Sequence, residues 1–191
     1  RSSSPPPLPP SSSLAPLTGA VASDVHAAIA VHCLVKMDAP LLARAGAIAP
    51  LCRAAAPTAP TKLRGWAVGA LAHFTKHAAL RGKLLVAIPA LLRAISPDAA
   101  ADCNAWAGEA LAQLCRAGPA CAQCLKQGAM PLLLAQLRVH ADAVGGAPPP
   151  ADEDASAAAV RSTLNALRAL CTVAPGRALL AAKDGGIGSL V

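Results

Sequence analysis

The sequence predicts an all-α protein built from a repeated helical unit, and two observations support this prediction. Of 191 residues, 54% are hydrophobic, yet Tyr is absent, Phe occurs once and Trp twice. The apolar content is mostly Ala, Leu and Val; Ala and Leu are strong helix formers, and aromatic strand formers are scarce. Apolar or small residues also recur at the i, i+3, i+4 and i+7 spacing of one helix face.

This helical spacing occurs in four segments, and the distances between them define a period. The segments cover residues 23–36, 62–77, 102–117 and 160–171. Equivalent positions lie 42 residues apart from His32 to Phe74, 40 from Phe74 to Leu114 and 56 from Leu114 to Leu170. A period of roughly 40–42 residues is typical of helical solenoids, in which each unit buries its apolar face against its neighbours.

A second motif repeats with the same period. It combines a small pair, an Ile or Met, a Pro-or-Gly spacer and a Leu pair. It occurs as GAIAPLCRAA (46–55), VAIPALLRAI (86–95), GAMPLLLAQL (128–137) and GGIGSLV (185–191). Gly46 and Gly128 predict a sharp turn after a short helix, because glycine adopts left-handed backbone angles cheaply. Pro50, Pro89 and Pro131 predict helix starts, where a missing N–H costs little.

Two segments depart from the repeat. Residues 1–22 are rich in Pro and Ser, which predicts an extended arm before a repeat domain at 23–191. Residues 139–157 lengthen the last interval, and removing about 15 of them restores the period. Their prolines and clustered acids predict an exposed, mobile loop between two helices. We expect Ser23 or Asp24 to cap the first helix of the repeat domain.

The sequence resembles armadillo repeats over residues 23–191. In that family a short first helix leads through a Gly-Ala-Ile-Pro-type turn into a second helix, and a longer third helix follows. PLLARAGAIAPLCRA (40–54) and KLRGWAVGALAHFTKH (62–77) match one such unit. The resemblance implies a right-handed solenoid of about three full repeats plus partial ones at both ends. Residues 176–191 would begin a further unit, so we expect a neighbour or further repeats to cover this end.

The register predicts which apolar side chains are buried between repeats. The predicted core residues on the third helices are Leu71, Phe74, Leu111, Leu114, Leu167 and Leu170. His32 occupies the position that Phe74, Leu114 and Leu170 fill in the other units, so we interpret it as a packed core histidine.

The resemblance also implies a binding surface, because third helices line a concave groove in armadillo proteins. Relatives such as the nuclear import receptor alpha subunit carry an asparagine ladder there; the matching positions are Val31, His73, Gln113 and Ala169, so the ladder is missing. Basic side chains on or beside these helices predict a mildly electropositive face that prefers acidic or polar protein segments. The predicted groove residues are Arg64, His73, Lys76, Gln113, Arg116, Arg161 and Arg168. The alternative is that these basic residues point outward and only solubilise the helices.

No pattern in the sequence predicts catalysis, a cofactor or a metal site. Cys121 and Cys124 form a C-x-x-C pair with Cys115 nearby, but a second pair that would complete a zinc site is missing. We interpret these cysteines as small buried apolar residues, which suits a reducing compartment. His73 and His77 have i, i+4 spacing without the Glu of a metalloprotease motif, and we expect them to face the groove or the solvent.

The function that these observations predict is non-catalytic. The leading hypothesis is a protein–protein interaction scaffold or a structural subunit of a larger assembly, in the cytoplasm or cytoskeleton, for instance a ciliary axoneme, or else in an organelle. A reversible peptide-binding adaptor is one alternative, and a cysteine-based metal or redox sensor is another. The net charge is +7, but Lys and Arg are dispersed, so we expect no nucleic-acid partner. We also expect no membrane span, since no uninterrupted apolar run reaches the required length.

Overall fold

The computed structural model describes residues 15–96, 98–146 and 153–182, and these residues form helices and turns without a strand. The α-helices are α1 (Ala15–Arg44), α2 (Ile48–Ala54), α3 (Thr61–Thr75), α4 (Ile88–Ala94), α5 (Ala101–Leu114), α6 (Gly118–Lys126), α7 (Ala129–Gly146), α8 (Glu153–Leu170) and α9 (Ala174–Ala181). Two short 3₁₀ segments, η1 (Ala78–Leu80) and η2 (Lys83–Ala87), precede α4. The predicted all-α class is confirmed for the described residues.

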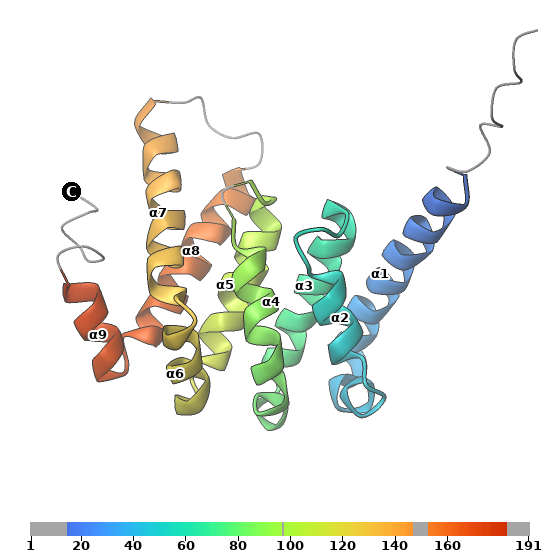
Figure 1. Ribbon diagram of the computed structural model, residues 1–191, viewed down its shortest axis with the longest axis horizontal. Helices are drawn as coiled ribbons and strands as arrows, with labels where there is room; N and C mark the ends of the chain where they lie inside the picture. Colours follow the sequence, from blue (N-terminus) through green and yellow to red (C-terminus); the bar gives the residue numbers. More distant parts are fainter. Residues whose placement is uncertain (1–14, 97, 147–152, 183–191) are drawn as a thin grey trace, which may run out of the picture.

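The helices are arranged from α1 to α9 along the long axis of the molecule, with α8 between α5 and α7 (Figure 1). Helices α1, α3, α5 and α8 form a row, here called the main row, in which each helix packs against the next. Helices α2 and α4 also contact each other, as do α7 and α9. The side-chain amide of Gln123 in α6 donates to the carbonyl oxygen of Leu85 in η2 at 3.2 Å. Contacts therefore join elements that lie about one period apart in the sequence.

The four segments with helical periodicity coincide with the four helices of the main row. The turns between shorter helices also agree with the sequence: Gly46 has φ 82° and Gly128 has φ 77°. A side chain with a Cβ would be strained at either position. Pro89 is at the start of α4, where no intrahelical hydrogen bond is lost.

The hydrophobic core runs between the helices of the main row and the helices α2, α4, α6 and α7 that pack on them. All six leucine and phenylalanine side chains predicted on the third helices are buried. Phe74, Leu71 and Leu114 have no exposed surface at all. His32 is buried as well, with 4% exposure, so its interpretation as a packed histidine is confirmed.

Helix α1 differs from the prediction at its N-terminus. It begins at Ala15, so residues 15–22 of the predicted extended arm are helical, and residues 1–14 lie outside the described part of the chain. Ser23 and Asp24 are inside this helix and do not cap it. The alanines and the Leu and Val between residues 15 and 22 are compatible with helix, and this propensity outweighs the Pro/Ser character of the preceding residues.

A kink divides α1. Asp38 has non-helical angles, φ −148° and ψ 75°, and Pro40 follows two residues later. The carboxylate oxygen Oδ1 of Asp38 accepts a hydrogen bond of 2.9 Å from the backbone N–H of Leu41. This is the N-cap arrangement, in which a side chain satisfies a free N–H of the first helical turn. The short stretch from Asp38 to Arg44 therefore starts as a separate helix, close to the first residue of the segment 40–54 that resembles an armadillo unit.

The predicted loop at 139–157 is largely helical. Helix α7 continues to Gly146 and α8 starts at Glu153, so the residues outside the described part are only 147–152. Of the clustered acids, Glu153 and Asp154 occupy the first turn of α8, where negative charge is favourable beside the positive end of the helix dipole.

Within α1, the stretch Ser23–Arg44 is long and apolar enough to cross a membrane by length and composition alone, with a mean hydropathy of 1.4. A helix that packs in a protein core can pass the same test. Only 22% of the apolar window is buried; Val35 and Ala39 are fully buried where α1 packs against α3, whereas Met37 is 84% exposed. The absence of a membrane span stays a prediction.

Candidate functional site

The candidate site is a groove between α5 and α8, and a glycine sets how closely these helices approach. A Cβ atom at Gly108 of α5 would lie 2.8 Å from Oγ of Ser162 and 3.1 Å from its backbone carbon. The Ser162 hydroxyl is satisfied within its own helix, because it donates to the carbonyl oxygen of Ala159 at 2.9 Å. Small residues at the crossing thus allow the two helices to touch.

An open groove of about 700 Å³ lies between the two helices, and Ser162 is part of its lining. Its walls combine small, amide and charged side chains with one indole. The lining residues are Asp102, Ala105, Trp106, Glu109, Ala112, Gln113, Arg116, Ala158, Arg161, Ser162, Asn165, Arg168, Ala169 and Thr172. The space between the walls stays open because four of the lining residues are alanines, and larger side chains at these positions would fill it.

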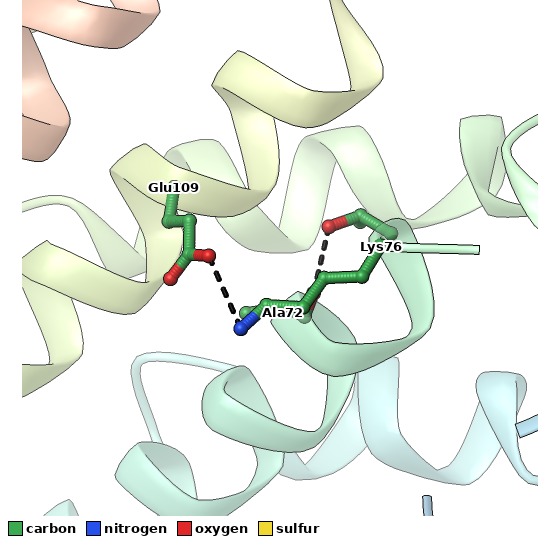
Figure 2. A network of polar contacts seen from close by, with 4 residues as sticks. Ala72, Lys76 and Glu109 are labelled. Carbon is green, nitrogen blue, oxygen red and sulfur yellow. Dashed lines mark hydrogen bonds and ion pairs between the residues drawn. The ribbon is translucent and has the colours of Figure 1, made fainter. Parts of the chain in front are cut away.

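Charge in the groove is predominantly positive. Arg116, Arg161 and Arg168 are exposed, and within the described residues none of them forms an ion pair. Of the two carboxylates, Glu109 is engaged by Lys76, whose Nζ lies 3.3 Å from Oε1 of Glu109 (Figure 2). Lys76 follows the end of α3, so this ion pair joins α3 to α5. Only Asp102 remains to balance the three arginines.

The two walls of the groove run in the same direction. Cys121 of α6, which follows α5 after a short turn, has its Sγ 3.8 Å from the carbonyl oxygens of Ala169 and Leu170 in α8. The C-terminal end of α8 therefore lies beside the C-terminal end of α5. Arg116 and Arg168 belong to this end of the groove, whereas Asp102 belongs to the opposite end.

Beside the groove lies a cluster of four rings, His32, Trp66, His73 and Trp106, here called the aromatic cluster. The centroid of the His32 ring is 4.9 Å from that of His73, 5.1 Å from Trp66 and 5.7 Å from Trp106. The two indoles are 6.2 Å apart. These distances are typical of favourable edge-to-face and tilted ring contacts. Trp106 belongs both to this cluster and to the groove wall.

The aromatic cluster depends on a second glycine. A Cβ atom at Gly69 of α3 would lie 2.9 Å from Cε3 of Trp106 and 3.0 Å from Nδ1 of His32. His32 comes from α1 and Trp106 from α5, so side chains of the two helices that flank α3 meet across Gly69. The glycine therefore permits a contact between main-row helices that are not neighbours.

The histidines of this cluster resist protonation. Burial, together with the positive charges of Lys36, His73 and Lys76, lowers the pKa of His32 to about 4. Burial also lowers the pKa of His73, with Lys76 as the next cause. Nδ1 of His32 is buried and has no hydrogen-bond partner among the described residues. Both rings are therefore neutral near pH 7 and act as apolar packing groups.

The structure brings together four of the seven groove residues predicted from the sequence. Gln113, Arg116, Arg161 and Arg168 line the groove. The other three lie on or just after α3, outside the groove lining: His73 is in the aromatic cluster and Lys76 pairs with Glu109. Arg64 is half-buried near Cys103, where its charge opposes the burial that raises the pKa of that thiol.

Sequence reasoning missed Trp106, Glu109 and Asn165 as groove residues. The spacing of Asp102, Trp106, Glu109, Gln113 and Arg116 follows one face of a helix at intervals of three or four. That face could have been identified once Gln113 and Arg116 were assigned to the groove. Only the structure shows that α8 lies opposite it.

The cysteines form no recognisable metal site. Cys115, Cys121 and Cys124 are buried, and a hydrogen bond with Cys124 together with burial raises the pKa of the Cys115 thiol. All seven cysteines of the chain are free thiols. In the described ranges, no group of three or more His, Cys, Asp or Glu side chains is arranged to hold a metal ion. The buried position predicted for these three cysteines is confirmed.

Comparisons of the chain with protein-family models, with curated proteins and with solved structures found no match.

Proposed function

We propose that this chain is a non-catalytic protein-interaction module of the armadillo-like solenoid type, which holds an acidic or polar segment of a partner protein along the main row. The observation that carries the proposal is the groove between α5 and α8, where three arginines without ion-pair partners among the described residues face the solvent. Such a groove suits the capture of an extended segment, because its donors already point outward and its hollow is open.

Equivalent hydrogen bonds at equivalent positions support a repeated unit. Nε of Arg81 donates to the carbonyl oxygen of Thr75 at the end of α3, at 3.2 Å. Nη1 of Arg177 donates to the carbonyl oxygen of Cys171 at the end of α8, at 3.1 Å. In both cases an arginine six residues downstream satisfies a free carbonyl at a helix C-terminus, where a cation is also favourable for the helix dipole.

The proposal has two versions, which differ in whether the partner stays bound permanently. A structural subunit would hold its partner permanently, whereas an adaptor would release it. The open, solvent-exposed groove favours reversible capture, because exposed ion pairs contribute little individually and are screened by salt. We therefore propose that the groove binds its partner reversibly, as an adaptor does, on a fold of the scaffold type.

The test reverses charge at the C-terminal end of the groove. The variant Arg116→Glu/Arg168→Glu should lose recruitment to the native assembly, and the salt dependence of the remaining recruitment should flatten. Charges at the surface act over a Debye length of about 8 Å at physiological ionic strength, so high salt should weaken the wild type most.

Exposed arginines on α2 and α4, outside the groove, provide a matched control. Arg53 in α2 and Arg93 in α4 are also exposed arginines, and neither lines the groove. The variant Arg53→Glu/Arg93→Glu changes net charge equally and should be recruited like the wild type. Equal recruitment of both double variants and the wild type, with equal salt slopes, would remove the groove from the function.

A further inference from the structure

We infer that the groove selects an extended segment in which a bulky apolar side chain and a pair of adjacent acidic side chains are separated by about four or five residues. This inference rests on the proposed function and specifies its ligand. The apolar side chain packs on Trp106, and the acidic pair binds Arg116 and Arg168.

The indole of Trp106 is a preformed contact surface. Its ring lies 5.7 Å from His32 and 6.2 Å from Trp66, with the backbone of Gly69 close behind it. These neighbours hold the ring on one side, while its partly exposed side lines the groove. A side chain that is already held in place loses little conformational entropy when a ligand binds. Trp106 therefore offers an apolar anchor point at low cost.

The charges near Trp106 nearly cancel. Asp102 is one helical turn before it on α5, and Arg161 stands on α8 one residue before Ser162, the residue that touches Gly108. Glu109 is neutralised by Lys76 at 3.3 Å. This half of the groove therefore combines an apolar ring with no strong net charge, which suits an uncharged bulky side chain.

The C-terminal half of the groove has the opposite character. Arg116 lies eight residues after Gly108, and Arg168 lies six residues after Ser162, so the two arginines are on facing walls beyond the helix crossing. Gln113 is beside them, and neither carboxylate of the groove is at this end. Two guanidinium groups without a counter-charge match two carboxylates better than one, since each Arg binds a carboxylate through paired hydrogen bonds.

The distance between the two halves determines the spacing in the ligand. Trp106 lies eight residues before Leu114, the last residue of α5, which at about 1.5 Å per residue corresponds to roughly 12 Å, and Arg116 is in the turn two residues further on. An extended chain advances about 3.3 Å per residue, so it covers this distance in four or five residues. A segment with both groups much closer together can satisfy only one half of the groove.

The experiment is a selection from a displayed library of random peptides against the purified chain. Parallel selections use Trp106→Leu, Arg116→Gln/Arg168→Gln and the control Arg53→Gln/Arg93→Gln. We expect enriched peptides with an aromatic or large aliphatic residue and an acidic pair at the stated spacing. Their retention should fall on the Trp106 variant and on the groove arginine variant, and should persist on the control.

Peptide variants test the same point on the unaltered protein, so the result does not depend on the folding of Trp106→Leu. Replacing the apolar residue of an enriched peptide by Ala should weaken binding about tenfold, as truncation of a central anchor does. Replacing the acidic pair by Gln, or moving the two groups next to each other, should weaken it similarly. The chain has two Trp and no Tyr, so Trp66→Phe makes the Trp106 emission a direct reporter of occupancy.

The outcomes separate this inference from the proposed function. Enriched peptides that are acidic but indifferent to Trp106 and to their own apolar residue would overturn the inference and leave the proposed function standing. If no enriched peptide depends on Arg116 and Arg168, both are wrong.

Discussion

The junctions between α3 and α5 and between α5 and α8 each have a glycine at the helix contact, Gly69 and Gly108, but the first junction is filled and the second is open. Between α3 and α5, the aromatic cluster fills the space around Gly69 with rings from three helices. Between α5 and α8, the three atoms nearest to a Cβ at Gly108 all belong to Ser162, and alanines on both walls leave about 700 Å³ open. The side chains beside the crossing are aromatic rings in the first junction and small residues in the second, and this difference makes one junction part of the core and the other a groove.

The electrostatics of the two junctions differ in the same way. In the filled junction the ionisable rings are forced to stay neutral, because burial lowers the pKa of His32 to about 4. In the open junction Arg116, Arg161 and Arg168 are exposed. A buried junction stabilises the row, and an open one remains available to a partner.

The largest expected effect comes from the helix that the two junctions share. Leu111 on α5 is 1% exposed, and Leu111→Ala should lower the free energy of unfolding by about 2–5 kcal/mol, since it removes buried methyl groups and leaves a cavity. Urea unfolding followed by Trp fluorescence measures this. Leu164→Ala on α8, at a side chain that is 50% exposed, should cost less than about 0.5 kcal/mol. A similar small loss for Leu111→Ala would contradict the packing described for α5.

Next come the two glycines at the junctions. Gly69→Ala and Gly108→Ala should each cost about 1–3 kcal/mol, because the added Cβ atom meets a ring or a neighbouring helix at 2.9 Å or less. Gly69→Ala should also shift Trp emission, since Trp106 must move, whereas Gly108→Ala should not.

Gly65 provides the matched control for these glycines. It is in the same helix as Gly69, and a Cβ atom there would meet nothing within 4 Å. Gly65→Ala should therefore stabilise the chain by about 0.5–1 kcal/mol through the better helix propensity of alanine. Destabilisation by all three substitutions would show that helix geometry, and not close approach, requires the glycines.

A smaller effect is expected in the pH dependence of the free energy of unfolding, to which the filled junction contributes through His32. The folded-state pKa of His32 is lowered from 6.5 to about 4, so the unfolded chain binds the proton more strongly. Stability is then fully present above about pH 6.5 and declines as the pH falls toward 4, by about 1–2 kcal/mol after allowance for solvent screening. His32→Leu should flatten this part of the stability profile. Parallel profiles for both proteins would show that His32 does not titrate in this range.

The smallest effect concerns the ion pair that connects the two junctions. The side chains of Lys76 and Glu109 are 47% and 39% exposed, so their coupling should amount to only about 0.2–1 kcal/mol. A double-mutant cycle with Lys76→Met and Glu109→Gln, measured at low and high salt, gives this coupling and its screening. A coupling that high salt leaves unchanged would indicate a desolvated pair and a more enclosed groove.

Local patterns in the sequence determined much of the secondary structure. The four main-row helices, the turns at Gly46 and Gly128 and the burial of Phe74 and Leu111 all follow from periodicity and from the backbone preferences of single residues. Errors occurred where composition was taken as structure. The arm at 1–22 and the insertion at 139–157 contain helix-compatible residues beside prolines, and residues 15–22, 139–146 and 153–157 are helical.

The tertiary structure decided which residues share a site. The sequence placed Gln113, Arg116, Arg161 and Arg168 on two helices, but it could not show that those faces oppose each other across alanines. It also could not show that His32 and Trp106, 74 positions apart, meet over Gly69. Helix propensity and periodicity act within a few residues of the chain, whereas a groove or a ring cluster depends on how distant helices pack, and that depends on the fit of all their side chains at once.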